Sequence, residues 1–378
     1  MTVKWTAVDS GAIWVETSRS FLRLPSWATN RSGRLRLPVR AALALGDKGE
    51  RRPSPAYAVT VLTTTACNLG CSYCFQNVAL DSSQPFAPLR IEARHLAEDV
   101  AAEIANFVQD QMRRQSKEKL ELLIFGGEPL LAPQRIFALL AALSGCGLSK
   151  VEMISNAVKL TPELAAKLAD AGVNRIQVTF DGSQQAHDAV RRDHRGSGTY
   201  DKIATNIALA QEACGITFSI RVNLTGENIG TIGDLLDDLS SRIDASRCDL
   251  HLAIVDGTQA GFEPEFRPDY EGQLLDWYSL ARKHGFNVKP PVSVGDCAYC
   301  GTAGATGGAV INADGTLYSC WDSAGQDGYE VGHVRAGYYD DDRLAERWVS
   351  CGYQARHGPA PDGLARLGAE VLELLHGS

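Results

Sequence analysis

After residue 56, two patterns of apolar residues alternate along the chain, one typical of strands and one typical of helices. Short apolar stretches with β-branched residues alternate with longer segments in which apolar residues recur every three or four positions. The strand-like stretches cover residues 57–62, 120–125, 150–156, 175–180, 217–223 and 249–255. The helix-like segments cover residues 89–112, 133–143, 162–171, 200–214 and 230–243. Strands that alternate with helices predict an α/β protein with a parallel sheet and right-handed crossovers.

The same pattern divides the chain into five parts. Residues 1–57 form an N-terminal segment with an alternating stretch at Ile13–Glu16 and a short helix at Pro38–Leu45. The α/β domain follows, then a helical linker, a cysteine-rich region with a β-hairpin over residues 309–318 and an Asp-Gly turn, and a final helix. These four parts are predicted at residues 58–257, 258–291, 292–356 and 357–378.

Composition narrows the class of protein. Of 378 residues, 44% are hydrophobic and 22% are charged, as in ordinary globular proteins. The net charge of −8 argues against a nucleic-acid or membrane-surface partner, because phosphate binding relies on a basic excess. The first residues lack the apolar core of a signal peptide, and no apolar stretch approaches about 18 residues. We therefore expect a cytoplasmic protein.

Three cysteines follow the first predicted strand. Cys67, Cys71 and Cys74 have the spacing C-x₃-C-x₂-C, which lets three thiolates hold three corners of an iron–sulfur cube and leaves the fourth iron open. A structural zinc loop would normally show paired C-x₂-C motifs. A disulfide framework is disfavoured in a chain of this length with ten cysteines and no leader. An iron–sulfur cluster is the preferred interpretation.

This triplet, with Tyr73 before its last cysteine, resembles the hallmark of the radical S-adenosylmethionine (SAM) enzymes. The resemblance implies a partial (β/α)₆ barrel over about Ala58–Gly257, and a 4Fe–4S cluster whose open iron binds SAM. It also implies reductive cleavage of SAM to methionine and a 5′-deoxyadenosyl radical that abstracts hydrogen from a substrate. Tyr73 and Phe75, which flank Cys74, are expected at the cofactor site.

Further segments match the family in order. Gly126-Gly127-Glu128-Pro129 resembles the GGE segment that binds the methionine amino group: glycines let a backbone approach closely, and a carboxylate suits an ammonium. By itself this segment would be interpreted as a turn. Ser155-Asn156-Ala157 stands where relatives often have Thr-Asn-Gly near the ribose, and departs from it at two positions.

Three more elements complete the expected SAM site. Thr179-Phe180-Asp181-Gly182 resembles the Ser-x-Asp-Gly element. The His-Asp and Arg segment of the family follows at His187, Asp188 and Arg192, although a solvated helix end is an equal interpretation for His187. Arg221 could pair with the SAM carboxylate, because a buried arginine in a barrel needs a partner.

A second group of cysteines, Cys297, Cys300, Cys320 and Cys351, lies beyond the barrel. It resembles the SPASM/twitch extension, in which thiolates hold an auxiliary cluster. The dense cysteine run of a full SPASM domain is missing, so one auxiliary 4Fe–4S cluster is expected. A structural zinc at these four residues is the alternative. The remaining Cys146, Cys214 and Cys248 are expected to be packing residues.

The residues around Cys320 indicate which class of substrate to expect. Asp322 is displaced by one position from the acid that serves as base in sulfatase-maturating relatives, and Tyr318-Ser319-Cys320-Trp321 looks more like the peptide-maturase branch. The expected function is oxidative crosslinking, by a thioether or carbon–carbon bond, of a ribosomally made precursor peptide, with the auxiliary cluster as electron acceptor. Residues 1–57 could dock a leader peptide, although they are too few for a complete winged-helix domain. The resemblance also implies an electron donor such as flavodoxin or ferredoxin.

Other functions stay open at this point. A small-molecule dehydrogenase or epimerase of aminoglycoside type is the first alternative, and a sulfatase-type residue oxidase is the second. A zinc- or cluster-bearing binding protein without catalysis is the alternative outside enzymes, and the intact Cys67, Cys71, Cys74 and Glu128 argue against it.

Overall fold

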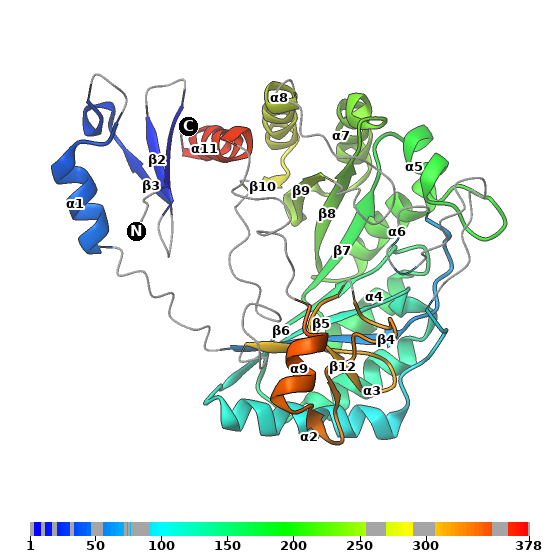
Figure 1. Ribbon diagram of the computed structural model, residues 1–378. Coiled ribbons are helices and arrows are strands. Elements are labelled where there is room, and N and C mark those ends of the chain that lie inside the picture. Colours follow the sequence, from blue (N-terminus) through cyan, green and yellow to red (C-terminus); the bar gives the residue numbers. More distant parts are fainter. Residues whose placement is uncertain are drawn as a thin grey trace.

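The barrel is a sheet of parallel strands in sequence order (Figure 1). The computed structural model describes residues 4–8, 12–16, 21–30, 34–46, 56–71, 74, 76, 91–254, 270–289, 307–321, 323–349 and 362–376. Each neighbouring pair of barrel strands is parallel, and the strands are β4 (Ala56–Thr64), β5 (Lys119–Gly126), β6 (Leu148–Ile154), β7 (Arg175–Phe180), β8 (Thr217–Leu224) and β9 (Cys248–Ile254). A short seventh strand that the sequence did not predict, β10 (Asn287–Val288), pairs in parallel with β9.

Helices connect successive strands, as the hydrophobic periods predicted. They are α2 (Glu98–Arg114), α3 (Pro133–Leu143), α4 (Pro162–Asp170), α5 (Gln184–Val190), α6 (Tyr200–Ala213), α7 (Ile232–Arg242) and α8 (Tyr270–Lys283), with 3₁₀ turns η2 (Pro129–Leu131), η3 (Ile229–Thr231) and η4 (Ala245–Arg247). Local chemistry sets the ends of α4, where the Thr161 hydroxyl accepts a hydrogen bond from Leu164 N and Gly172 follows with φ +99°. No helix in the described ranges is long and apolar enough to cross a bilayer.

The predicted start of the first barrel helix was wrong. Apolar spacing indicated a helix from residue 89, but α2 begins at Glu98 and residues 91–97 are not helical. These residues instead pair with the end of β4: Leu96 N donates to Thr63 O at 2.9 Å, and Arg94 N donates to Thr65 Oγ1 at 2.7 Å. Long-range hydrogen bonds to β4 thus override the local helical period.

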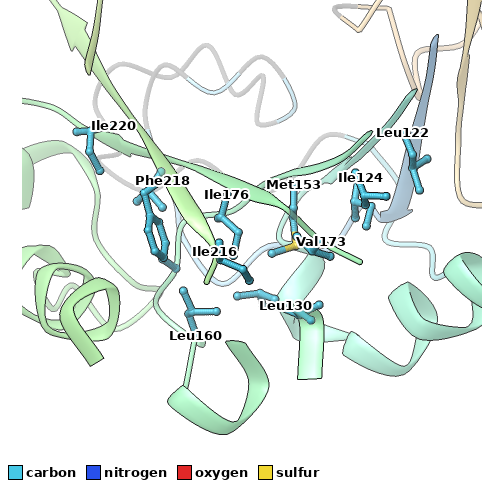
Figure 2. Close-up of a cluster of buried hydrophobic side chains, with 14 of the residues drawn as sticks. Leu122, Ile124, Leu130, Met153, Leu160, Val173, Ile176, Ile216, Phe218 and Ile220 are labelled. Carbon is cyan, nitrogen blue, oxygen red and sulfur yellow. The ribbon is translucent and has the colours of Figure 1, made fainter. Parts of the chain in front are cut away.

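Alternate residues of the strands face in opposite directions and have opposite chemistry. One set packs against the helices in a continuous apolar core, part of which Figure 2 shows between the sheet and its helices. The other set includes polar residues on several strands, among them Thr60, Gln177, Thr179, Ser219, Arg221 and Asn223. The sheet therefore has an apolar outer face under its helices and an inner face rich in hydrogen-bonding groups.

The predicted hairpin is present and continues the barrel sheet. Strand β11 (Gly308–Ile311) pairs in parallel with β4 and antiparallel with β12 (Thr316–Tyr318), through a turn in which Gly315 has φ +89°. Strands β13 (Gly332–His333) and β14 (Gly337–Tyr338) extend the sheet, and α9 (Asp341–Arg347) follows. Trp321 fixes this region to the barrel, because its Nε1 donates to Thr60 Oγ1 at 3.0 Å and its ring lies 6.2 Å from that of Phe125.

A separate small sheet lies near both ends of the described chain (Figure 1). Strands β1 (Lys4–Ala7), β2 (Ile13–Glu16) and β3 (Phe21–Leu24) are antiparallel, and are followed by the 3₁₀ turn η1 (Ser26–Ala28) and by α1 (Leu37–Gly46). Helix α11 (Asp362–His376) packs on the opposite face from α1. We call β1–β3, η1, α1 and α11 the N-terminal module.

Candidate active site

The cysteine loop leaves β4 at the carboxyl end of the parallel sheet, where such folds place their sites. Cys71 is 6% exposed, Cys67 and Cys74 are partly buried, and Cys74 N donates to Cys71 O at 3.2 Å. The three thiols lie near enough for the charges of Cys71 and Cys74 to act on Cys67. Two expected cofactor residues of this loop, Tyr73 and Phe75, lie outside the described residues.

Gly126 and Gly127 hold the base of the cysteine loop. A Cβ on Gly126 (φ +143°) would lie 2.0 Å from Thr64 O, and one on Gly127 would lie 2.3 Å from Ala66 O. Gly127 N donates to Thr64 O, and Glu128 N donates to Ala66 O, both at 2.8 Å. The close backbone approach that the sequence predicted for these glycines therefore includes an approach to the cysteine loop itself.

Glu128 is fully buried and holds the next loop in place. Its Oε1 accepts hydrogen bonds from Leu130 N at 2.9 Å and Ser155 Oγ at 2.8 Å, and its Oε2 accepts one from Asn156 N at 2.6 Å. Burial raises the pKa of Glu128, while these donors and the nearby Arg191 favour the carboxylate. Oε2 has one acceptor position beyond its bond to Asn156, which suits an ammonium group.

Asn156 connects the end of β6 to the cysteine loop. Its Nδ2 donates to Asn68 Oδ1 at 2.9 Å and lies 3.9 Å from Cys67 Sγ. The next residue, Ala157, is fully buried and has φ +58°, a conformation that normally favours glycine. This backbone explains physically why a glycine suits the third position of the segment. The contact from Asn68 was not predicted from the sequence.

The turn between α5 and α6 braces the other side of the cysteine loop. Leu69 forms a β-bridge with Asp193, and Gly70 N donates to Arg192 O at 3.1 Å. His194 Nε2 lies 3.0 Å from Cys67 O. This turn was predicted to contribute Arg192 to the cofactor site, and in the structure it also supports the cysteine loop through its backbone.

Two neighbouring arginines in this turn have different surroundings. The predicted residue, Arg192, donates from Nε to the carbonyl of Asp188 at 2.5 Å. Arg191 is the more buried residue, at 8% exposed, and its Nε lies 3.8 Å from Oδ2 of the buried Asp181. The Arg191 guanidinium lowers the pKa of Cys71, against the burial that raises that pKa to about 11. Sequence reasoning missed Arg191, because only packing separates it from its neighbour.

The remaining predicted residues lie on the inner face of the barrel. Thr179 on β7 is in register with Arg221 on β8, and Arg221 Nε donates to Asn223 Oδ1 at 2.8 Å. Asn228 ties the ends of these strands together, because its Nδ2 donates to Asp181 O at 3.2 Å and to Asn223 O at 2.7 Å. The carboxyl ends of β4 to β8 therefore bring the predicted segments together around one loop.

The second cysteine group is described only at Cys320, which follows β12 and is 7% exposed. Cys297, Cys300, Cys351 and the predicted base Asp322 lie outside the described residues. The three predicted packing cysteines are at element ends: Cys146 is 5% exposed after α3, Cys214 ends α6, and Cys248 is fully buried at the start of β9.

The chemistry of the cysteine loop fits a cluster. Burial, Glu128 and the neighbouring thiolates raise the pKa of Cys67 to about 12, and the positive charge of bound irons would offset this effect and favour the thiolate. No three His, Cys, Asp or Glu side chains in the described part of the chain converge on a single ion. A cubane does not require such convergence, because each thiolate binds its own iron. Cys67, Cys71 and Cys74 can thus each contribute one ligand to a 4Fe–4S cluster.

His187 is a core residue, and the alternative of a solvated helix end was wrong for it. It is fully buried, its ring lies 5.3 Å from Phe180 and 5.5 Å from Tyr200, and its Nε2 lies 3.1 Å from Thr199 Oγ1. Thr199 Oγ1 donates to Arg191 O at 2.8 Å, so His187 must donate from Nε2. Burial, with Arg191 nearby, holds the pKa of His187 well below 6.5.

We expect His187 to make the protein less stable in mild acid. As the pH falls below about 6.5, the unfolded chain binds a proton on this histidine and the folded chain does not, so the free energy of unfolding falls by up to about 1.4 kcal/mol per pH unit. His187→Gln keeps a donor and cannot titrate. Urea unfolding of both proteins in neutral and mildly acidic buffer measures the difference. His95→Gln, at an exposed position, should retain the wild-type pH dependence; an unchanged slope in His187→Gln contradicts the prediction.

Comparison with known proteins agrees with this geometry. Residues 61–239, which include the cysteine loop and the segments around it, match the family described as the Radical SAM superfamily. The chain is 25% identical over 284 residues to an AdoMet-dependent heme synthase of Methanosarcina barkeri, covering 68% of this chain and 74% of the relative. It is 26% identical over 286 residues to the mycofactocin maturase MftC of Mycobacterium tuberculosis, covering 72% and 66%.

Solved structures support the same fold. Native anSMEcpe with bound AdoMet matches with a TM-score of 0.58 at 14% identity, covering 85% of this chain and 97% of that one. Streptococcus suis SuiB bound to the precursor peptide SuiA matches with a TM-score of 0.52 at 13% identity, covering 97% and 93%. These matches identify residues 61–239 as a radical SAM domain in a partial TIM-like barrel, a domain whose cofactors are a 4Fe–4S cluster and SAM.

Proposed function

We propose that this enzyme oxidatively crosslinks a ribosomally made precursor peptide, by a thioether or carbon–carbon bond. The observation that carries the proposal is the N-terminal module, a second folded surface attached to a complete set of barrel strands. A barrel that encloses a small substrate has no need of such a surface, whereas a peptide can contact both. The similarity to a mycofactocin maturase supports the same class of substrate.

The residues of the site have separate roles in this proposal. Cys67, Cys71 and Cys74 hold the cluster, which when bound supplies the electron that cleaves SAM. Glu128 binds the SAM ammonium, and Arg221 binds its carboxylate from the inner face. The other expected SAM contacts are Tyr73, Phe75, Gly126, Gly127, Pro129, Ser155, Asn156, Thr179, Asp181 and Arg192.

The C-terminal region completes the oxidation. A crosslink removes two hydrogens from the peptide: one leaves as a hydrogen atom, and the other leaves as a proton and an electron. We assign the proton to Asp322 and the electron to an auxiliary cluster held by Cys297, Cys300, Cys320 and Cys351. The burial of Cys320 next to a hairpin that continues the barrel sheet supports this arrangement. A donor such as flavodoxin or ferredoxin supplies the first electron.

A tetrapyrrole oxidation is the second candidate function, because two of the curated relatives are AdoMet-dependent heme synthases. The polar inner face of the barrel, with Arg221 on β8, offers donors for carboxylates, which tetrapyrrole side chains would carry. This function has no evident use for the N-terminal module. The peptide is therefore the preferred substrate.

Metal analysis and a peptide assay test the proposal together. Anaerobically reconstituted protein is expected to hold about eight irons per chain, whereas about four irons with one zinc would assign the second cysteine group to zinc. Incubation with SAM, a reductant and a short peptide encoded beside the gene should lower the peptide mass by two hydrogens per crosslink. Turnover of a tetrapyrrole with no change in the peptide would overturn the proposal.

A further inference from the structure

The charge of the chain is unevenly distributed. Residues 1–56 contain ten Lys and Arg residues against four Asp and Glu, a net charge of +6, while the whole chain carries −8. The remaining residues therefore carry −14. A basic segment on an acidic protein attracts anionic partners to one place.

The described part of the N-terminal module also exposes apolar side chains. Five large hydrophobic side chains are exposed among the described residues, and three of them, Leu22, Trp27 and Leu37, belong to this module. Trp27 is 66% exposed and Leu37 is 80% exposed. Such exposure of large apolar groups on a small module is typical of a binding surface.

Backbone pairing brings η1, which contains Trp27, next to the start of α1 at Leu37. Thr29 and Leu35 form an antiparallel bridge, and Arg36 N donates to Ala28 O at 2.8 Å. The second bond joins the last residue of η1 to the residue before α1, so Trp27 and Leu37 each lie one residue from it. The sheet-facing side of this unit, Ala28 and Leu35, is buried against β2, so the unit is held in place.

Three exposed arginines surround this apolar pair. Arg34 and Arg36 precede Leu37, and Arg40 lies three residues after it on the same side of α1. In the described ranges, none of the three arginines forms an ion pair, in contrast to Arg23, which is paired with Glu373. We call Trp27, Leu37, Arg34, Arg36 and Arg40 the η1–α1 strip.

We propose that the η1–α1 strip docks an acidic segment of the substrate peptide, with an apolar side chain of that segment seated against Trp27 and Leu37. The inference rests on the proposed peptide substrate and adds the chemistry that recognises it. Carboxylates pair with the arginines, and the net negative charge of residues 57–378 disfavours binding of the same segment elsewhere on the protein. A nucleic acid or an anionic membrane would meet the same repulsion over a larger area.

A binding assay on the full chain, without reconstitution or SAM, tests this inference. The probe is a short fluorescein-labelled peptide in which Glu and Asp surround a Leu-Phe pair, and the comparator carries Lys in place of every acid. Fluorescence anisotropy should show that the acidic peptide binds at least about tenfold more tightly. Arg34→Glu with Arg40→Glu should remove this preference, and Trp27→Ala should weaken binding of the acidic peptide.

Matched variants on the barrel serve as controls. Lys167→Glu with Lys202→Glu makes the same charge change on exposed helical positions, and Leu209→Ala shortens an apolar side chain that is 40% exposed on α6. Both should bind the acidic peptide like the wild type. All substituted side chains are exposed, so circular dichroism should show folded proteins throughout.

Several outcomes would overturn the inference. Equal binding of the two peptides, or an equal loss in the barrel controls, would remove the role of the strip. Binding of duplex DNA or phosphatidylserine vesicles more tightly than the acidic peptide would also overturn it. Self-association of the protein that is lost in Trp27→Ala would do the same. If the strip binds the acidic peptide but the reconstituted enzyme leaves peptides unmodified, the proposed function fails while the docking surface stands.

Discussion

Cys71→Ala is expected to abolish formation of 5′-deoxyadenosine. Cys71 is 6% exposed and lies in the middle of the cysteine loop, so no other described cysteine can reach its corner of the cluster by a small movement. Without this thiolate the site should lose about four irons per chain. Iron and sulfide analysis, and chromatography of the nucleoside after incubation with SAM and dithionite, measure both effects.

Cys146→Ala is the matched control for this experiment. Cys146 is also buried, at 5% exposed, but its Sγ lies 3.6 Å from Gln109 Nε2 near the end of α3, away from the loop. This variant should keep the cluster and its activity. Retained nucleoside formation in Cys71→Ala would contradict the assignment of the cysteine loop as the site of SAM cleavage.

Gly127→Ala should have the second largest effect. The added Cβ would lie 2.3 Å from Ala66 O, so the backbone just before Cys67 must move. A displacement of about 1 Å in a catalytic group can cost about a hundredfold in rate, and overpacking costs about 1–3 kcal/mol of stability. We expect poor cluster loading and a comparable fall in SAM cleavage in a protein that still folds. Iron content and urea unfolding separate the two effects.

Gly233→Ala provides the control, because Gly233 lies in α7 with no atom within 4 Å of its added Cβ. Alanine is the better helix former, so this variant should gain about 0.5–1 kcal/mol and retain its cluster. If Gly127→Ala loads iron as fully as Gly233→Ala does, then the glycines do not support the cysteine loop.

The elements of the barrel could be predicted because each depends on local chemistry. Strand β7 and helix α3 match their predicted bounds, and α4 begins at its predicted residue, Pro162, after the Thr161 cap. The failures come from distant contacts. Residues 91–97 have helical spacing of apolar residues but do not form a helix, because they form hydrogen bonds to the end of β4. The spacing of apolar residues does not show which distant residues will form hydrogen bonds with a segment.

Some features of the candidate site could likewise be predicted from the sequence, and others could not. The motif segments could be found from residue types, and the parallel topology predicts that they meet at one end of the sheet. Which of Arg191 and Arg192 approaches Asp181 depends on the shape of the turn that follows α5. The position of the two glycines against Thr64 and Ala66 depends on a shift in the β4–β5 register. Neither can be derived from spacing alone.

The N-terminal module has a consequence for synthesis on the ribosome. Trp14 Nε1 donates a hydrogen bond to Glu373 Oε2 at 3.1 Å, and these residues are 359 positions apart in the sequence. The Arg23 guanidinium also donates hydrogen bonds to the Glu373 carboxylate. During synthesis, β1–β3 must therefore wait until the barrel and α11 have been made before one of their faces is covered. A stop codon before α11 should therefore leave this face of β1–β3 exposed to chaperones and proteases.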